Sequence, residues 1–307
     1  MKYLYIVNYP KGEKELFELE MKLFFGDDWA EPYFISEKYV ARNRSLYLKY
    51  QLQIDYVNSC LEELVKEMWL KQYTKDDYKV YYLEVNGIKT HFEDRLASMR
   101  KVGQNIVGNF NMLEVKDKIG VVKLNGFWYV GSLVVSDPKW ERYIHKPQSY
   151  SQSLPIRVAK SIVNLAIGDN LETTVIDGCC GVGTVVLEGL YMGANIIGCE
   201  VNWHIANHAK ENLSYYCYDH LLISHQNFLE NKQLFDCCIL DLPYGIVSKI
   251  SVADIDEMLK KAYSIAKKLI LVTTEPLVDL LKEIGYCNVQ IVCVRKQNFK
   301  RYIQVAE

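Results

Sequence analysis

The sequence predicts a mixed α/β protein in two parts: an α+β N-terminal half and a C-terminal half built on a mostly parallel, doubly wound seven-stranded sheet. From residue 156 onward, short apolar runs alternate with helical segments, as expected for parallel strands that are covered on both faces. The last two runs, at 289–295 and 302–306, flank a short polar turn, which makes one closing strand antiparallel. Before residue 145, strand-like and helix-like runs follow one another without that strict alternation.

The composition is that of an ordinary globular protein, with 50% hydrophobic and 24% charged residues. At roughly 100–200 residues per domain, a chain of 307 residues is expected to form two domains. The formal net charge of −2 excludes a strongly basic nucleic-acid protein of the histone type. It does not exclude a nucleic-acid enzyme, which needs only a local basic face.

The chain is expected to be cytoplasmic and to have no membrane contact. No run reaches the roughly 18 apolar residues that cross a bilayer, and the first apolar run is too short for a signal peptide. The nine cysteines are odd in number and include no Cys-x-x-Cys pair or zinc-like spacing. We therefore expect reduced, mostly buried thiols and no metal site.

The N-terminal half shows the periodicities of five strands and three helices. Asn125-Gly126 between its last two strands is a strong signal for a two-residue hairpin turn. Basic and acidic residues are nearly balanced in this half. The expected strands are 2–9, 45–54, 80–85, 119–124 and 127–136, and the expected helices are Glu13–Phe25, Tyr56–Trp69 and Arg95–Val107.

A polar, proline-containing linker at 137–155 predicts a domain boundary, with domains 1–145 and 146–307. The second domain is expected to fold on its own. Its expected strands are 173–178, 195–200, 221–226, 237–242, 269–274, 289–295 and 302–306, and its helices Ile156–Ala166, Thr184–Met192, Trp203–Tyr216, Val252–Ala266 and Leu277–Ile284.

A glycine-rich loop follows the first strand of this domain and opens a helix. Asp177 precedes the loop, Gly181 and Gly183 allow a ligand to approach the backbone, and Thr184 starts a helix whose free N–H groups face the ligand. Glu200 ends the next strand, where a carboxylate accepts bonds from two ribose hydroxyls. An aspartate before the loop suits an ammonium group better than a pyrophosphate, so the loop predicts S-adenosylmethionine (SAM) rather than NAD.

Further residues of the predicted SAM site flank this loop and the next strand ends. Cys179 is interpreted as a small residue that fits a tight space, and Val201 follows Glu200. Asn227, after the third strand, either contacts the adenine edge or caps a local turn. Glu188, in the helix after the loop, is expected to be a solvated or capping charge.

The sequence Asp241-Leu242-Pro243-Tyr244-Gly245 ends the fourth strand, at the edge where open α/β sheets bind ligands. An exocyclic amine is a poor nucleophile, and the Asp241 carboxylate and Leu242 carbonyl are placed to accept its two N–H bonds. Pro243 stiffens the loop. Tyr244 offers a ring for base stacking, worth roughly 1–3 kcal/mol.

Residues 146–245 resemble class I amino-methyltransferases of nucleic acids, and more narrowly the THUMP-linked tRNA guanine-N2 methyltransferases. The likeness lies in three segments that are similar to family motifs: 146–166, Asp177–Asn202, and Asp241–Gly245, which is similar to Asp-Pro-Pro-Tyr-Gly. Leu242 replaces a proline, but it retains the carbonyl that the mechanism needs. The strand and helix order of residues 1–145 is compatible with a ferredoxin-like segment followed by a THUMP-like RNA-binding segment.

The resemblance implies a SAM-dependent RNA methyltransferase acting on an exocyclic base nitrogen, guanine N2 of tRNA, with tRNA or another structured RNA as partner. Arg295 and Lys296, in a basic cluster with Lys300 and Arg301, are the expected substrate-binding cations. Two alternatives stay open: N6-adenine methylation of RNA or DNA, and a SAM-fold protein that binds RNA or a partner without turnover.

Overall fold

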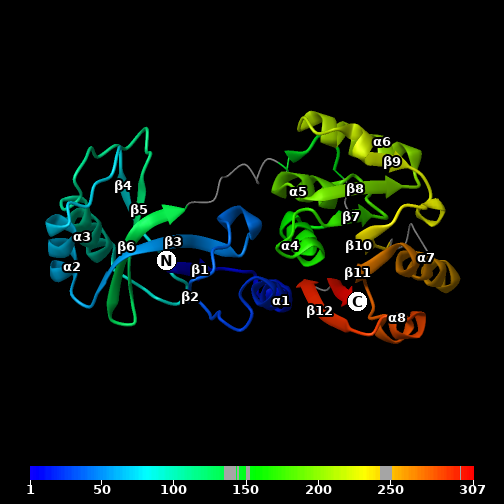
Figure 1. Cartoon of the computed structure of the whole chain (residues 1–307), viewed down its shortest axis with the longest axis horizontal. Helices are drawn as coiled ribbons and strands as arrows, with labels where there is room; N and C mark the ends of the chain where they lie inside the picture. The colour runs from blue at the N-terminus through cyan, green and yellow to red at the C-terminus, as the bar shows by residue number, and fades with distance from the viewer. Residues whose placement is uncertain (135–142, 144, 150–152, 243–250, 298) are drawn as a thin grey trace. The chain divides into compact units, whose positions relative to one another are not determined.

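A computed structural model describes residues 1–134, 143, 145–149, 153–242, 251–297 and 299–307 (Figure 1). The chain forms two compact units. The first contains Met1–Asn8 and Phe25–Asp137, and the second contains Tyr9–Phe24 and Pro138–Glu307. Each unit has its own sheet.

The first unit contains a six-stranded sheet in the order β2-β1-β3-β6-β5-β4. Only the pair β4–β5 is parallel. The predicted hairpin turn is confirmed, because Asn125 and Gly126 both have left-handed φ angles of 49° and 83°. The strands are β1 (Tyr3–Val7), β2 (Tyr33–Ser36), β3 (Leu48–Asn58), β4 (Lys79–Tyr82), β5 (Lys118–Leu124) and β6 (Phe127–Val134), and the helices α2 (Leu61–Leu70) and α3 (Phe92–Gly103).

Two expectations for this unit were wrong. The strand β2 was missed, since its four residues are too few to show a periodicity. The helix expected from Tyr56 begins at Leu61, because β3 continues through Asn58 in register with β6. The Asn58 side chain then accepts the N–H of Cys60 and turns the chain toward α2.

The second unit contains a seven-stranded sheet in the order β12-β13-β11-β10-β7-β8-β9. All neighbours are parallel except at β13, which is antiparallel to both β11 and β12, as the sequence predicts. The strands are β7 (Thr174–Asp177), β8 (Asn195–Glu200), β9 (Ile223–His225), β10 (Phe235–Asp241), β11 (Ala266–Thr273), β12 (Val289–Lys296) and β13 (Phe299–Ala306).

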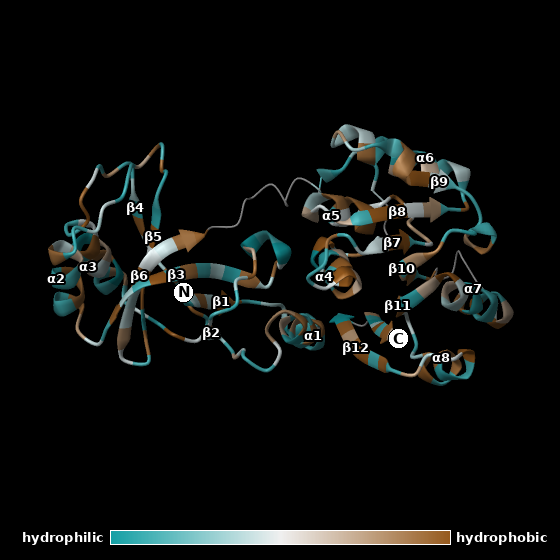
Figure 2. Cartoon of the chain, in the orientation of Figure 1, coloured by the Kyte–Doolittle hydropathy of each residue, from teal (hydrophilic) through white to brown (hydrophobic). Residues whose placement is uncertain are grey.

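Helices cover both faces of this sheet. The core on one face draws buried residues from α1, α4, α5 and α6, and the core on the other face draws them from α7 and α8. Figure 2 shows hydrophobic colour on α4 and on the central strands. The helices are α1 (Lys14–Phe25), α4 (Ile156–Ile167), α5 (Thr184–Met192), α6 (Trp203–Tyr215), α7 (Val252–Ile265) and α8 (Val278–Ile284).

The segment before α1 and the helix itself cover the outer strand β12. Gly12 lies so close to this strand that an added Cβ would stand 2.0 Å from the carbonyl oxygen of Arg295. Glu15 Oε2 accepts the N–H of Cys293 at 2.7 Å. Leu16 belongs to the same buried core as α4 and β13. An edge strand that is covered in this way is protected against pairing with another chain.

The compact units and the predicted domains differ at one segment. The sequence placed all of residues 1–145 in the first domain, whereas Tyr9–Phe24 is part of the second compact unit. An amphipathic stripe reveals that a helix buries one face, but it does not reveal against which sheet. The division into domains 1–145 and 146–307 remains a proposal about independent folding, and a fragment of residues 146–307 would lack this helix.

The placement of α1 can be tested by hydrogen exchange. Leu16 and Leu64 are both fully buried, in the second and the first unit respectively. Leu16→Ala should destabilise its surroundings by about 2–5 kcal/mol and speed amide exchange in β11 and β13. Leu64→Ala, the matched control, should speed exchange in β5 and β6. Faster exchange in β5 after Leu16→Ala, with β11 unchanged, would contradict the placement.

Candidate functional site

Three carboxylates stand at the carboxyl ends of neighbouring strands. Asp177 ends β7, Glu200 ends β8 and Asp241 ends β10. In the sheet register Asp177 pairs with Gly198 and with Ile239, and Glu200 and Asp241 each lie two residues further along. Since side chains alternate between the faces of a strand, all three project to the same face of the sheet at the same edge.

The loop after Asp177 depends on its glycines. Gly181 and Gly183 have φ angles of 53° and 80°, which only glycine adopts readily. A Cβ on Gly178 would stand 2.6 Å from a Leu240 carbon. The backbone therefore packs tightly here, and Gly183 is the N-cap of α5, which begins at Thr184 directly at the end of the loop.

Glu200 fixes this loop to the end of β8. Its Oε2 accepts the N–H of Gly181 at 3.1 Å, and its Oε1 accepts the N–H of Asn202 at 2.8 Å. Each carboxylate oxygen has a further lone pair for a ligand hydroxyl. The geometry thus fits the ribose-binding role predicted for Glu200 and adds a structural one.

Asp177 and Asp241 are both hard to ionise. Burial, together with the charge of Asp241, raises the pKa of Asp177 to about 8, although the Cys179 backbone N–H donates to it. Burial raises the pKa of Asp241 to about 7, opposed by the charge of Arg301. Asp241 Oδ1 is buried without a hydrogen-bond partner among the described residues. A ligand with positive charge and N–H donors would satisfy both groups.

The other predicted cofactor residues occupy varied positions around the loop. Burial raises the pKa of Cys179 well above its usual value, so its thiol is neutral and no nucleophile. Thr184 is the buried first residue of α5, and Val201 is exposed beside Glu200. The Asn227 side-chain oxygen accepts the N–H of Leu229 at 3.1 Å. This bond corresponds to the capping alternative and leaves the amide N–H groups for other contacts.

The predicted chemical motif is only partly described. Leu242 is buried, and its N–H donates to the carbonyl of Val272 at 3.1 Å, which holds Asp241 at the end of the strand. Pro243 and Tyr244 lie outside the described residues.

The basic residues separate into exposed and buried groups. Arg295 and Lys296 are exposed at the end of β12, the outermost strand, and the structure does not bring them to the three carboxylates. Arg301 on β13 is buried. From the sequence it was grouped with the exposed cations. Its spacing of two residues from the apolar Ile303 places it on the buried face of β13, and this spacing was a signal that could have distinguished it.

Glu188 was predicted wrongly. It is fully buried in α5, and its carboxylate pairs with the equally buried Lys160 of α4 at 3.2 Å. The pair is part of the contact between these two helices and does not face solvent.

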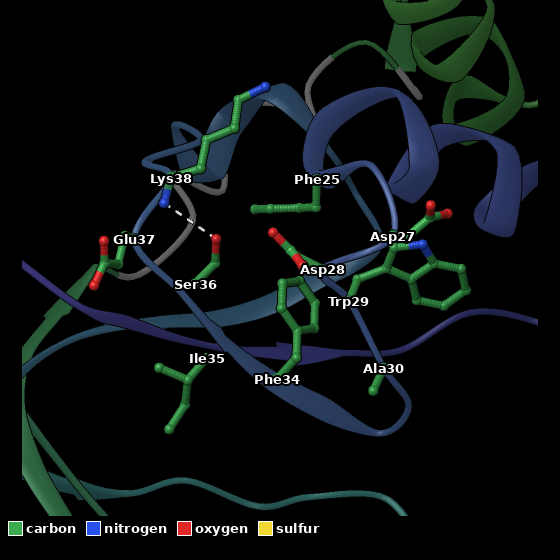
Figure 3. A pocket seen from close by; sticks show the side chains of 10 residues that line it. All are labelled: Phe25, Asp27, Asp28, Trp29, Ala30, Phe34, Ile35, Ser36, Glu37 and Lys38. Carbon is green, nitrogen blue, oxygen red and sulfur yellow. Dashed lines mark hydrogen bonds between the residues drawn. The ribbon is translucent and has the colours of Figure 1, made fainter.

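One cavity of the first unit, of about 550 Å³, does not fit an anionic ligand (Figure 3). Asp27, Asp28 and Glu37 place three carboxylates in its lining, against one cation, Lys38. Acidic side chains repel phosphate, so this cavity is a poor candidate for nucleic acid.

Within the described ranges, no group of three His, Cys, Asp or Glu side chains is placed to hold a metal ion. In the same part of the chain, no helix is both long and apolar enough to cross a membrane.

Comparisons with known proteins match the second half of the chain. Residues 145–275 match the family described as RMKL-like, methyltransferase domain (UPF0020). A tRNA (guanine(10)-N2)-dimethyltransferase of Methanothermobacter thermautotrophicus is 28% identical over 103 residues, which are 33% of this chain and 30% of that protein. The protein of the same name from Methanocaldococcus jannaschii is 29% identical over 121 residues, 36% of this chain and 34% of that protein. The match therefore spans about a third of these relatives.

A crystal structure of TrmN from Thermus thermophilus superimposes with a TM-score of 0.49 and 13% identity, covering 100% of this chain and 99% of that one. The fold assignment rests on the strand order of the second sheet, with its antiparallel β13 between β11 and β12, which is the Rossmann-like order expected for class I methyltransferases. Residues 145–275 are similar to RMKL-like methyltransferase domains.

Proposed function

We propose that this chain is a SAM-dependent RNA methyltransferase that transfers a methyl group to an exocyclic base nitrogen, guanine N2 of tRNA. The observation that carries the proposal is the buried Asp241 Oδ1 without a partner among the described residues, on the same face and edge as Asp177 and Glu200. The matched relatives named as tRNA guanine-N2 dimethyltransferases support the choice of base and RNA. The cytoplasm is the expected location.

The cofactor would lie over the loop between β7 and α5. Asp177 would accept from its ammonium group, Glu200 from its ribose hydroxyls, and the N–H groups at the start of α5 would face its carboxylate. When bound, the cofactor supplies an electrophilic methyl group on a sulfonium. Gly181, Gly183, Thr184, Val201 and Asn227 remain proposed contacts around it.

The target amine would lie against Asp241 and the carbonyl of Leu242. Accepting its N–H bonds would orient the nitrogen lone pair and compensate the charge that grows on nitrogen during transfer. Asp241 must be ionised for the strongest acceptance. Pro243 and Tyr244 keep their proposed roles in the loop and in base stacking.

The function is tested directly with labelled SAM and unmodified total tRNA, followed by digestion to nucleosides. Labelled N2-methylguanosine or its dimethyl form supports the proposal. Labelled N6-methyladenosine would favour the alternative enzyme, and SAM binding without transfer would favour a non-catalytic protein. Transfer to DNA but not to RNA would overturn the choice of substrate.

Removal of the Asp241 carboxylate should separate chemistry from cofactor binding. Asp241→Ala should lower the single-turnover rate by about 10²–10³-fold, with SAM affinity little changed, since one preorganised acceptor of the amine is lost. Asp236→Ala is the matched control, because Asp236 is the carboxylate at the opposite end of β10, bound to Thr174. Equal rates for Asp241→Ala and the wild type would refute the mechanism.

Cofactor binding should release a proton. Below a pH of about 8 Asp177 is protonated, and pairing with an ammonium group requires its ionised form. SAM affinity should therefore rise between about pH 6 and pH 7.5, by at most about tenfold per pH unit. Calorimetry in buffers of different ionisation enthalpy measures the released proton. S-adenosylhomocysteine, which keeps the ammonium but lacks the sulfonium, should release it too; binding without proton release would contradict the role of Asp177.

RNA contact by the first unit is a separate part of the proposal. A groove of about 760 Å³ runs between β4 and α3. Lys79, Arg95 and Arg100 line it, with exposed rings of Phe92 and Phe110, and no carboxylate is among its described lining residues. Cations beside exposed aromatic rings are the composition that binds unpaired nucleotides, the rings by stacking and the cations at phosphates.

Two substitutions in this groove should weaken tRNA binding in different ways. Phe92→Ala should cost about 1–3 kcal/mol of affinity at all salt concentrations, because a stacking surface is lost. Arg100→Gln should lower the slope of log affinity against log salt by about one. Phe127→Ala removes a similarly exposed ring outside the groove and is the control. If all three variants bind tRNA like the wild type, the groove is not the RNA platform.

A further inference from the structure

The strand β13 carries a buried cation to the edge of the sheet where Asp241 lies. Asp241 pairs with Val272 of β11, and Val272 pairs with Ile303 of β13. Arg301 lies two residues before Ile303, so its side chain projects to the same face as Asp241. Because β13 runs antiparallel, those two residues also move Arg301 toward the carboxyl ends of the parallel strands.

Arg301 differs from the other cations of the β12–β13 hairpin in its burial. It is 9% exposed, and its guanidinium lies over the ring of Phe299, 4.9 Å from the centroid. Arg295, Lys296 and Lys300 are exposed. Burying a guanidinium is costly unless negative charge lies near it, and the carboxyl edge supplies that charge.

Among the described residues, Arg301 is the cation whose charge lowers the pKa of Asp241. Asp177 on β7 and Glu200 on β8 are the acidic side chains at the same edge. On α4, Arg157 pairs with Glu13 and Lys160 pairs with Glu188. On β11, Lys268 pairs with Glu307 at the opposite edge. The charge of Arg301 lowers the pKa of Asp241, whereas burial raises it.

We infer that Arg301 is a positioning residue for Asp241, which holds this carboxylate ionised so that it accepts the N–H bonds of the target amine. The inference rests on the proposed function, because it assigns Arg301 to the same transfer step. It does not assign Arg301 to the RNA backbone, where sequence reasoning grouped it with the exposed cations of the hairpin.

The charge of Arg301 determines how well Asp241 can accept hydrogen bonds from the target amine. A protonated Asp241 would present one O–H donor to the amine and would keep only part of its acceptor capacity. Without Arg301, Asp241 would share the edge with two other carboxylates and no opposing charge from β13. The acidic limb of the transfer rate should then move to higher pH.

The first measurement is the single-turnover rate against pH for the full chain. In Arg301→Gln the acidic limb of this rate profile should move to higher pH by about one unit. The transfer rate should then fall about tenfold near pH 6 and change little near pH 9. Arg301→Lys keeps the charge and should keep the limb within about half a unit. Lys268→Gln, the control, removes a cation from the same face at the opposite edge and should leave the limb in place.

The second measurement does not require activity. Carbon-13 labelling of aspartate carboxyls, with Asp241→Asn to assign the signal, follows the titration of Asp241 by NMR in the chain without ligands. The titration of Asp241 should move to higher pH in Arg301→Gln than in the wild type. If the wild type transfers no methyl group, the proposed function fails while this titration still tests the Arg301–Asp241 pair.

Several results would overturn the inference. A loss of SAM affinity in Arg301→Gln with an unmoved acidic limb would assign the guanidinium to the cofactor. A raised KM for tRNA with unchanged kcat at every pH would assign it to RNA. If Arg301→Gln does not fold, Arg301→Met, which keeps the apolar stem without the charge, takes its place, and an acidic limb that stays in place would refute the inference.

Discussion

The carboxylate of Glu200 is the interaction on which the site depends, because it joins two segments that the sheet alone leaves separate. Its two oxygens accept the N–H groups of Gly181 and Asn202, so the glycine loop and the start of α6 are held to one strand end. The left-handed glycines then direct the chain into α5. The position of Asp177 relative to the loop follows from that arrangement, since Asp177 is the last residue of the neighbouring strand.

The buried acids of the site work against the stability of the fold. The pKa of Asp177 rises from an ordinary 3.8 to about 8, so the folded chain holds this proton to higher pH than the unfolded chain does. As far as this carboxyl is concerned, the fold is therefore most stable below about pH 4. It loses that stability as the pH rises through 8 and Asp177 ionises. At 1.36 kcal/mol per pKa unit, the ionised form costs on the order of 5 kcal/mol at high pH. A bound cation recovers much of that cost, so ligand binding and fold stability are linked at this edge.

The bounds of helices and strands were predicted best where the apolar residues had a clear periodicity and residues typical of helix or strand ends flanked them. Asn195–Glu200 and Thr184–Met192 have the predicted bounds, because glycines or polar residues flank an apolar run. The candidate site was predictable as strand-end acids around a glycine loop. The pairing of Lys160 with Glu188 and the burial of Arg301 were not, since both depend on which elements pack together. Whether Asn227 caps a turn was undecidable from one residue, and the structure shows the cap.

The position of α1 has a consequence for the order in which the chain assembles. Glu15 and Cys293, which meet at the edge of the second sheet, are separated by 278 positions. During synthesis the helix emerges well before β12, so its apolar side stays exposed until that strand has been made. The first sheet has all six strands by Val134, with α1 inserted between its first two. Completion of the second core is thus a late, long-range closure, the kind of contact that slows folding and exposes hydrophobic surface in the nascent chain.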